Sequence, residues 1–399
     1  MRSGGIFLTG SSGFLGMELL ARFLANTERT IYALIRGGDD DEASERLRVA
    51  ARTVLPGADR FGSRLVPVRG DVTLPDLGLD EQLRERLAED VTQVVHSAAS
   101  VSFNLPLDKA RAINTEGTRR LLEFAKLCAL RGDGLERYAH VSTAYVAGTH
   151  RGAFYEHDLN RGQRFNNSYE LSKWEAEQHV RSCARRIPVT IVRPSIVVGE
   201  EDSGWTPAFN VVYGPLAAYS RGSLPVLPAR RSAPVDVVPV SYVADAIFNL
   251  ASREDTVGQT YTLAAGPEAS NVGELIDMSA AAFGRRRALA LRPSVYRRVV
   301  HPWLVGRGSP TRRRAVKRTE AYFPYFDMRA RFDTGAAIAA LEPAGIHAPP
   351  LSRYFDALVR FAEEAEWGRR PLSRVDARAT VDSRPASERP LPRLQPVSA

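Results

Sequence analysis

Short apolar segments alternate with longer segments of helical periodicity over the first two thirds of the chain. Residues 5–10 form the first apolar segment, and apolar residues then recur three to four apart from Leu15 to Leu24, which is the spacing of one helix face. Further strands are predicted at residues 30–35, 65–68, 91–96, 138–146 and 189–198. Strands that alternate with helices form a parallel sheet covered on both faces. The pattern therefore predicts an α/β fold with a doubly wound parallel sheet.

The last third of the chain is predicted to be mostly helical. Apolar residues have helical spacing over 275–283, and residues 354–367 are predicted to form an amphipathic helix. After Pro371 the chain is rich in Arg, Pro and Ser and poor in apolar residues, so we expect a dispensable, disordered tail over 371–399. The predicted division is a first domain of residues 1–200 with 235–265 returning to it, and a smaller domain of residues 200–235 and 266–370.

A glycine-rich turn joins the first strand to the first helix, with the sequence Thr-Gly-Ser-Ser-Gly-Phe-Leu-Gly. Gly10 permits a tight turn, Gly13 permits close backbone approach to a pyrophosphate, and Gly16 lets the helix and strand pack closely. The spacing departs from the stricter G-x-G-x-x-G pattern, so a turn without a ligand is the alternative. The candidate cofactor contacts in this turn are Thr9, Gly10, Ser12, Gly13, Phe14, Leu15 and Gly16.

Basic residues follow the second predicted strand, where an NAD-binding protein usually has an acid for the ribose. Arg36 ends that strand and Arg46 lies on the following helical stretch. Both favour a 2′-phosphate, so we expect NADPH rather than NADH, although the aspartates at 39–41 weaken this interpretation. A solvated strand end is the alternative for Arg36. Further candidate contacts follow the third and fourth strands: Asp71 and Val72 near the adenine, and the small residues Ser97, Ala98 and Ala99 beneath the cofactor.

A hydroxyl, a phenol and an ammonium group complete the candidate chemistry. Thr143 lies near the end of a predicted strand, and Tyr169 and Lys173 are one helical turn apart. Hydride transfer to a carbonyl leaves an oxyanion, which needs an acid and a hydrogen-bond donor. Tyr169 is the candidate acid, Lys173 the cation that lowers its pKa and reaches the ribose, and Thr143 the donor to the oxygen. Without the other motifs, a surface helix pair would be the simpler interpretation of Tyr169 and Lys173.

Several stretches resemble the extended short-chain dehydrogenase/reductase superfamily and, within it, fatty acyl-CoA reductases (male-sterility type) and thioester reductase domains. They are the glycine turn and residues 96–103, 140–146, 169–175, 193–197 and 236–240. The resemblance covers residues 5–250 and implies a Rossmann-like fold with Thr143, Tyr169 and Lys173 as catalytic residues. It also implies that Asn114 belongs to a proton relay, although an Asn that opens a helix is usually an N-cap. By the same resemblance, Pro194, Ser195 and Ile196 bind the cofactor.

The resemblance also implies an activity, the NADPH-dependent reduction of an acyl thioester on coenzyme A or an acyl-carrier protein, with no metal. Whether the aldehyde is released or reduced further to the alcohol stays open. Gly204-Trp205 and Pro215-Leu216 are expected to begin the substrate wall, and the apolar run at 209–219 favours an apolar ligand. Two alternatives also stay open: another extended-family oxidoreductase, of the hydroxysteroid dehydrogenase or nucleotide-sugar epimerase type, and an NADP-binding regulator without turnover.

The net charge of +8 is concentrated in one segment. Residues 285–318 contain twelve Lys or Arg and no Asp or Glu, with apolar residues between them. Such a segment suits the phosphates of coenzyme A, the acidic face of a carrier protein, or an anionic membrane surface contacted peripherally. A solvated, arginine-rich helix pair is the alternative, and no motif supports binding to nucleic acid.

The two cysteines, Cys128 and Cys183, fall in helical stretches, and we expect core thiols rather than nucleophiles or a disulfide. No apolar run reaches the roughly 20 residues needed to span a bilayer. The first strand starts almost at residue 1, so no signal peptide is expected. Together these features predict a cytoplasmic protein.

Overall fold

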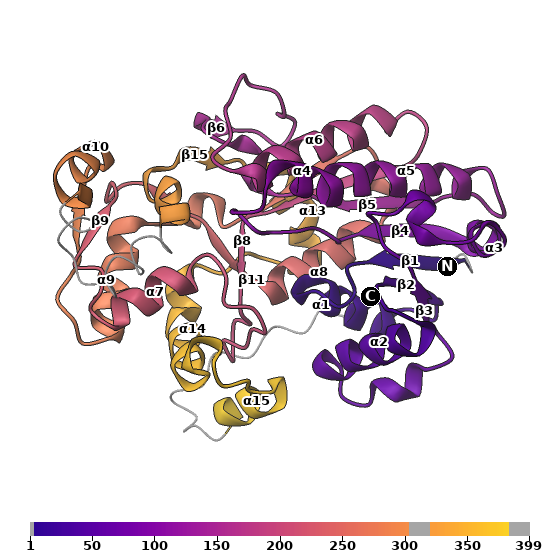
Figure 1. Cartoon of the computed structure of the whole chain (residues 1–399), viewed down its shortest axis with the longest axis horizontal. Helices are drawn as coiled ribbons and strands as arrows, with labels where there is room; N and C mark the ends of the chain where they lie inside the picture. Colours follow the sequence, from indigo (N-terminus) through magenta and orange to yellow (C-terminus); the bar gives the residue numbers. More distant parts are fainter. Residues whose placement is uncertain (1–3, 303–319, 383–399) are drawn as a thin grey trace.

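A seven-stranded parallel sheet forms the centre of the computed structural model, which describes residues 4–302 and 320–382 (Figure 1). The strand order is β12-β7-β5-β4-β1-β2-β3, and every neighbouring pair is parallel. The strands are β1 (Gly5–Thr9), β2 (Ile31–Ile35), β3 (Leu65–Arg69), β4 (Val91–His96), β5 (Arg137–Val141), β7 (Val189–Pro194) and β12 (Thr260–Leu263). Strand order reverses beside β1, so the predicted doubly wound α/β sheet is confirmed.

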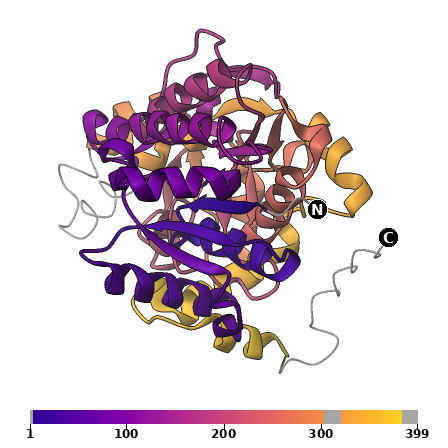
Figure 2. The ribbon, with the colours of Figure 1, turned by 90° about the vertical axis from the view of Figure 1, so that its right-hand side faces the viewer.

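Helices cover both faces of this sheet (Figure 2). The alternating residues of β1 show why, because Ile6 and Leu8 join one apolar cluster while Phe7 joins the other. The first face packs against α1 (Phe14–Asn26), α2 (Asp40–Val54), α8 (Val240–Ala251) and α13 (Gly335–Leu341). The second face packs against α3 (Glu81–Asp90), α5 (Glu116–Ala129) and α6 (Ser168–Cys183). Cys128 and Cys183 are buried, free thiols in the second cluster, as predicted.

A smaller part of the molecule has its own apolar cluster, beside the sheet (Figure 1). Its strands form short pairs: β8 (Ile196–Val198) with β11 (Val237–Pro239), β9 (Val226–Pro228) with β14 (Leu289–Leu291), and β10 (Pro234–Val235) with β13 (Ser270–Asn271). Its helices are α7 (Tyr213–Ser220), α9 (Val272–Ala282), α10 (Pro293–Val295) and α14 (Leu351–Glu364). Helices α9 and α14 confirm the two helices predicted from apolar spacing.

Two further segments connect these parts. Strand β6 (Arg151–Phe154) pairs in parallel with β15 (Arg329–Phe332), which follows a 3₁₀ helix at Glu320–Asp327. Helix α4 (Leu107–Ala110) continues through a π-helical turn, Arg111–Thr115, into α5. The 3₁₀ helix and the π-helical turn both bring side chains to the site described below.

Two strands predicted as continuous are interrupted. The strand predicted at 138–146 ends at Val141, because Thr143 caps a 3₁₀ helix by accepting a hydrogen bond from the Tyr145 amide (3.2 Å). The strand predicted at 189–198 is divided at Ser195. Its first half pairs with β12 inside the main sheet, whereas its second half pairs with β11 outside it. In both cases the chain leaves the sheet at the edge where the candidate residues lie.

The prediction of a disordered tail from residue 371 is wrong for residues 374–382, which form α15 (Arg374–Asp382) beside α1 and α2 (Figure 2). An ion pair holds this helix, in addition to apolar packing of Ala377. The buried guanidinium of Arg374 contacts Glu200 at 2.5 Å and Glu18 at 3.0 Å. Residues 383–399 lie outside the described residues.

The basic segment is described only as far as residue 302. Arg292, Arg297 and Arg298 are exposed there, on and beside α10, while Arg287 pairs with Asp277 on α9 (2.9 Å). Residues 303–318, with six of the twelve basic residues of the predicted patch, lie outside the described part, so the role of the patch stays a prediction. Within the described ranges, no helix combines the length and the apolar character needed to cross a bilayer.

We predict that Arg374→Met lowers the free energy of unfolding by roughly 3 kcal/mol, because it removes the most deeply buried cation beside the carboxylates of Glu18 and Glu200 and leaves them only Arg22, Arg378 and the Ser203 hydroxyl. Arg378→Met is the matched control on the same helix. Arg378 also pairs with Glu200, but its side chain is 53% exposed against 8% for Arg374, so its loss costs at most about 1 kcal/mol. Urea unfolding followed by circular dichroism measures both, and equal losses would contradict the role given to Arg374.

Candidate active site

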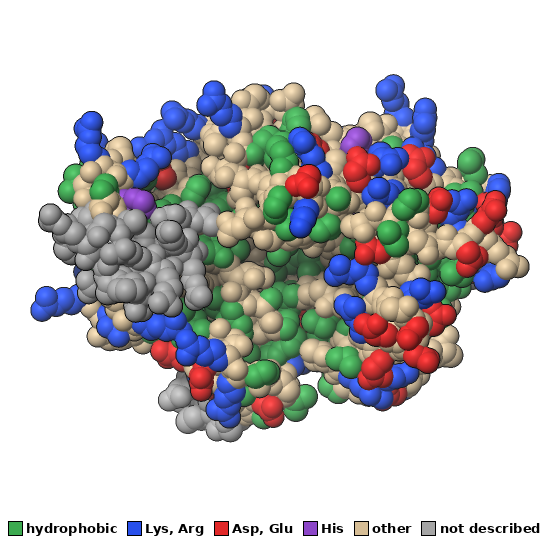
Figure 3. Space-filling view, viewed as in Figure 1, with side chains coloured by type: hydrophobic (Ala, Val, Ile, Leu, Met, Phe, Trp, Pro, Cys, Tyr) green, Lys and Arg blue, Asp and Glu red, His purple; other side chains and the backbone are tan. Residues whose placement is uncertain are grey.

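Two connected cavities form a groove along the edge of the sheet where the parallel strands end. Four residues, Gly10, Gly13, Ser97 and Ala99, line both cavities, each of which encloses about 1,210 Å³. Figure 3 shows the surface hollowed near the middle of this face, with hydrophobic side chains in the hollow. Ligands of open α/β sheets bind in this position, outside the carboxyl ends of the strands.

Every cofactor-contact residue predicted from the sequence lines one of these cavities. The first contains Thr9, Ser12, Arg36, Arg46, Asp71, Val72 and Ala98, and the second contains Phe14, Leu15, Gly16, Tyr169, Lys173, Pro194, Ser195 and Ile196. They lie at or just after the ends of strands β1, β2, β3, β4 and β7, or on helices α1, α2 and α6, so the parallel sheet brings them to one edge. Their individual roles stay predictions.

The glycine turn leaves its backbone accessible. Gly10 has φ +78°, and a Cβ there would lie 2.7 Å from the Ala98 nitrogen, so only glycine fits without strain. A Cβ at Gly16 would lie 1.9 Å from the Gly10 carbonyl oxygen. Helix α1 begins after Gly13 with no side-chain cap and no acidic residue in its first turn. The backbone amides and the helix dipole can therefore meet the pyrophosphate of a dinucleotide, so the turn fits such a cofactor.

The adenine end of the groove carries the two arginines that favoured a 2′-phosphate. Arg36, at the end of β2, and Arg46, on α2, are both exposed and line the same cavity as Asp71. Glu42 lies 3.8 Å from Arg46 and offsets part of its charge, whereas Asp39 caps α2 by accepting from the Glu42 amide. The predicted interference from Asp39 is therefore reduced, because its carboxylate is used by the helix N-terminus.

The three candidate catalytic side chains meet in the second cavity. Thr143 and Tyr169 are hydrogen-bonded through their hydroxyl groups; Thr143 is buried and Tyr169 is half-buried. Lys173, one turn further along α6, donates from Nζ to the carbonyl oxygen of Val141 (2.7 Å). The groups that would meet a carbonyl oxygen thus converge from α6 and from the end of β5.

The pKa of Tyr169 is not lowered, as was expected from the sequence, but raised. Burial raises the pKa of Tyr169 to about 12, partly offset by its hydrogen bond with Thr143. Burial also lowers the pKa of Lys173 to about 8, while the charge of Glu177 acts in the opposite direction. The predicted lowering of the Tyr169 pKa by Lys173 is therefore not seen, because burial dominates and the ammonium group bonds to the backbone of β5 instead.

A buried ion pair lies directly beneath the trio. Glu177, one turn beyond Lys173, binds the guanidinium of Arg193 on β7 at 2.6 and 3.0 Å and accepts from the Ser142 hydroxyl at 2.7 Å. Burial alone would disfavour its charge, but Arg193, Arg181 and Ser142 outweigh that effect and hold the pKa of Glu177 below its usual value. This carboxylate fixes α6 against the two strands that carry the rest of the site.

Asn114 is not the N-cap of a helix, which was its simplest interpretation. It lies in the π-helical turn, is buried, and accepts from the Ser100 amide (2.8 Å) while donating to the Ser100 carbonyl (3.0 Å) and the Ser172 hydroxyl (2.9 Å). It lines neither cavity. Its contacts join the loop after β4 to α6, and the proton relay role stays a prediction.

Sequence reasoning missed several residues that line the second cavity, among them Phe103, Tyr145, Asn210, Val211 and Tyr325. Phe103 and Tyr145 belong to the stretches that carry the resemblance, which was the available signal for them. Asn210 and Val211 lie in the apolar run at 209–219 that favoured an apolar ligand, but no motif marked them individually. Tyr325 comes from the Glu320–Asp327 helix, more than 150 residues from the candidate acid.

Of the two pairs expected to begin the substrate wall, one lines a cavity, and its contact with substrate stays a prediction. Pro215 and Leu216 line an apolar cavity next to the catalytic one. Trp205 does not, because its ring packs between Phe14 (6.1 Å) and the guanidinium of Arg374 (5.6 Å) near α15. Trp205 is a core residue that joins α1 to the C-terminal helix.

Comparison with known proteins shows the family to which the chain belongs. The family model described as "Male sterility protein", an NAD-binding domain, matches residues 8–247. The chain belongs to this family. That agrees with the resemblance inferred from the motifs and with the groove along the sheet edge.

Relatives of this family member include the fatty acyl-CoA reductase wat of Drosophila melanogaster, 32% identical over 64% of this chain and 55% of the relative. A linear gramicidin synthase of Brevibacillus parabrevis is 30% identical over 67% of this chain and 5% of its own length. The chain thus spans about half the length of the fatty acyl-CoA reductases it matches first. Among solved structures, the terminal R domain of the myxalamid PKS-NRPS pathway has a TM-score of 0.78 at 28% identity, covering 93% of this chain and 94% of that domain.

We predict that affinity for the nicotinamide cofactor falls on the alkaline side with a midpoint near pH 8. The pKa of Lys173 in the free protein is about 8, so the ammonium is present below that pH and lost as pH rises through it. Loss of a hydrogen bond from a charged donor weakens binding about tenfold or more. Cofactor fluorescence titrated from pH 6 to 10 measures the change.

Glu177→Gln should move this midpoint to lower pH, because the charge of Glu177 raises the pKa of Lys173. Glu175→Gln is the matched control, since Glu175 is on the same helix but pairs with Arg111. An alkaline midpoint that stays in place in Glu177→Gln, with the variant folded by circular dichroism, would refute the assignment to Lys173.

Proposed function

We propose that the chain is an NADPH-dependent reductase of acyl thioesters, acting on acyl groups carried by coenzyme A or by an acyl-carrier protein. One observation carries the proposal. The Thr143, Tyr169 and Lys173 cavity joins the glycine turn on one side and an apolar cavity on the other. A dinucleotide and an apolar acyl chain would therefore meet at the only trio described that can handle the proton of a reduced carbonyl.

The relatives support the same choice of substrate. The curated names include fatty acyl-CoA reductases, and the solved R domain with 28% identity comes from a PKS-NRPS pathway. Solved structures related to nucleotide sugars, such as MoeE5 with UDP-glucuronic acid and NAD, share only 22% identity and support the fold alone. The described lining of the apolar cavity has no charged side chain to receive a diphosphate.

When bound, the cofactor supplies the hydride that attacks the thioester carbonyl. Thr143 donates to the carbonyl oxygen and stabilises the oxyanion that forms on it. Tyr169 then donates its phenolic proton to that oxygen, which gives a neutral hemithioacetal. Breaking the carbon–sulfur bond returns the proton from the hydroxyl to Tyr169 and releases the aldehyde and a thiolate, which takes a proton from water. Lys173 would hold the cofactor through a hydrogen bond to its ribose and would keep a positive charge beside the tyrosinate.

The same residues would serve a second reduction of the aldehyde to the alcohol, with a second NADPH, if the aldehyde stays bound. Analysis of the products by gas chromatography separates the two outcomes. Incubation with NADPH and a panel of acyl-CoAs, aldehydes, ketosteroids and nucleotide sugars tests the substrate class. Cofactor oxidation with acyl-CoAs supports the proposal, and oxidation only with ketosteroids or nucleotide sugars would refute it.

Tyr169→Phe is expected to lower kcat at least about a hundredfold, because the variant lacks the proton donor, a group that contributes about 10²- to 10⁴-fold in enzymes of this type. Cofactor affinity should stay within about threefold of the wild type, since the ring is retained. Steady-state kinetics and fluorescence titration measure the two quantities. A fully active variant would remove Tyr169 from the mechanism.

Preference for NADPH over NADH is expected to depend on Arg36. Arg36→Ala should weaken NADPH binding about tenfold and leave NADH binding unchanged, because only NADPH has the 2′-phosphate. Arg48→Ala is the control, since Arg48 is exposed on α2 but pairs with Glu45 and does not line the groove. Equal weakening of both cofactors, or a wild type that prefers NADH, would contradict the assignment.

A further inference from the structure

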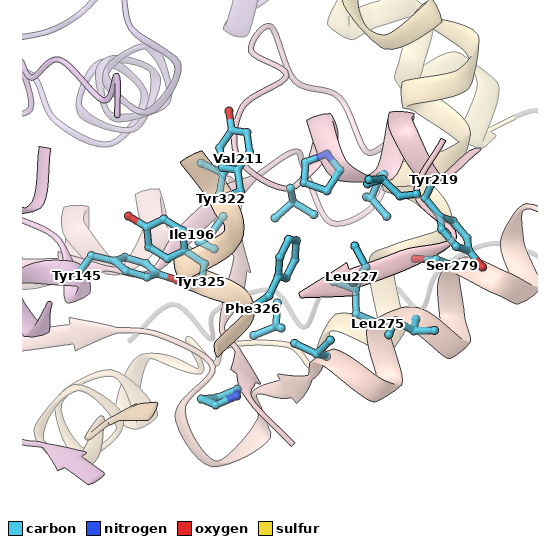
Figure 4. A pocket seen from close by; sticks show the side chains of 18 residues that line it. Tyr145, Ile196, Val211, Tyr219, Leu227, Leu275, Ser279, Tyr322, Tyr325 and Phe326 are labelled. Atoms are coloured by element: carbon cyan, nitrogen blue, oxygen red, sulfur yellow. The ribbon is translucent and has the colours of Figure 1, made fainter. Parts of the chain in front are cut away.

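The catalytic cavity opens into a second, apolar cavity, with about 750 Å³ of space between its lining atoms when the part open to solvent is included (Figure 4). Four residues line both spaces and so form the junction between them: Tyr145, Ile196, Val211 and Tyr325. In Figure 4, Tyr145 and Tyr325 lie at one side of the apolar cavity, and Tyr219 and Ser279 lie at the opposite side. The cavity therefore extends away from the candidate catalytic trio and has a distinct far end.

The walls of this cavity suit an apolar chain. They come from α7, β9 and α9, with side chains such as Leu216, Leu227 and Ile276. No charged side chain occurs among the described residues that line it. An anionic group placed there would have no buried partner, which disfavours a phosphate or a free carboxylate at the far end.

Tyr325 is fixed at the junction by the helix that carries the candidate acid. Its hydroxyl donates to Glu170 Oε1 and accepts from the side-chain amide of Asn167, both at 2.7 Å. Asn167 caps α6 and Glu170 follows Tyr169 directly. The ring of Tyr325 stacks on Phe103, with centroids 5.2 Å apart, and contacts Tyr145 edge to face at 5.1 Å. Four contacts thus set the position of one aromatic ring.

A second residue of the junction, Val211, has a strained backbone. Val211 has φ +45°, a left-handed conformation that a β-branched residue rarely adopts. Such strain persists only where the surrounding structure imposes it, and it gathers at functional sites. Hydrogen bonds to α6 therefore hold Tyr325 in the junction. The surrounding structure holds Val211 in its left-handed backbone conformation.

We propose that Tyr325 is a specificity-determining residue at the passage between the catalytic and apolar cavities, and that an unbranched acyl chain occupies the apolar cavity. The inference rests on the proposed function, since the chain is the one that a thioester positioned at Thr143 and Tyr169 would extend. Glu170 and Asn167 act as positioning residues through Tyr325. The distance from the junction to Ser279 sets the length of chain that binds best.

Chain-length profiles test the proposal. For the wild type, kcat/KM with saturated acyl-CoAs should rise by up to about fourfold per added methylene until the cavity is full, because each methylene is removed from water. Ser279→Phe fills the far end and should move the optimum to shorter chains. Tyr325→Ala widens the junction and should move the optimum to longer chains. Tyr325→Phe, which keeps the ring but not its bonds to α6, should flatten the profile without moving the optimum.

Tyr354→Phe is the matched control. Tyr354 is also buried and donates its hydroxyl hydrogen to a backbone oxygen, that of Val237 (2.8 Å), but it lines none of these cavities. Its chain-length profile should equal that of the wild type. If Ser279→Phe does not fold, Ser279→Leu introduces a smaller obstruction at the same place. An optimum that stays unchanged in both the Ser279 and Tyr325→Ala variants would overturn the proposal, and so would shifts in the same direction.

A binding assay separates this proposal from the proposed function. If the wild type reduces no acyl-CoA, the proposed function fails, and the cavity is then tested with cis-parinaric acid, a fluorescent 18-carbon acid. Binding by the wild type and by Tyr354→Phe, with at least about tenfold weaker binding by Ser279→Phe, supports an acyl chain in the cavity. Equal binding by all three proteins, or no binding by the wild type, overturns it.

Discussion

The buried carboxylate of Glu177 is the interaction on which the geometry of the site depends. It joins α6 to the Arg193 guanidinium on β7 and to Ser142, the residue before Thr143. Both partners of the ion pair are almost fully buried, so their desolvation is tolerable only because the pair is bidentate and further hydrogen-bonded. Since Tyr169, Lys173 and Glu177 recur every four residues, they share one face of α6. Fixing Glu177 therefore aligns the whole row against the end of β5.

The same helix organises the substrate side through its first turn. Glu170 and Asn167 bind Tyr325, which lines both the catalytic cavity and the apolar one. Helix α6 thus positions both the candidate acid and one wall of the junction between the two cavities. A shift of this helix would alter proton transfer and chain binding together, which explains why polar groups anchor it at both ends.

Sequence reasoning succeeded where local pattern determines structure. Strands of a parallel sheet are apolar runs, and their carboxyl ends meet at one edge, so the groove and most of its lining could be predicted. Sequence reasoning failed where contacts between residues far apart in the chain determine the local structure. Nothing local marks Ser195 as the point where a strand leaves the sheet, or shows that α15 forms. That helix is ordered by Arg374 binding Glu18 and Glu200, which lie 356 and 174 residues earlier in the chain, so composition alone suggested disorder. Trp205 was expected in the substrate wall, but its ring packs against Phe14 and Arg374, which are also far from it in the sequence.

The use of lysine and arginine in this network follows from their different chemistry. The chain has 50 arginines and four lysines, yet a lysine occupies the position beside the candidate acid. Arg193, which stays charged and presents a planar fork, suits the permanent pair with Glu177. A second guanidinium at position 173 would compete for that carboxylate and could not deliver a compact charge to the ribose and the backbone of β5. Burial lowers the pKa of Lys173 to about 8 and Glu177 acts against that lowering, so one carboxylate both anchors the helix and keeps its neighbouring ammonium charged at neutral pH.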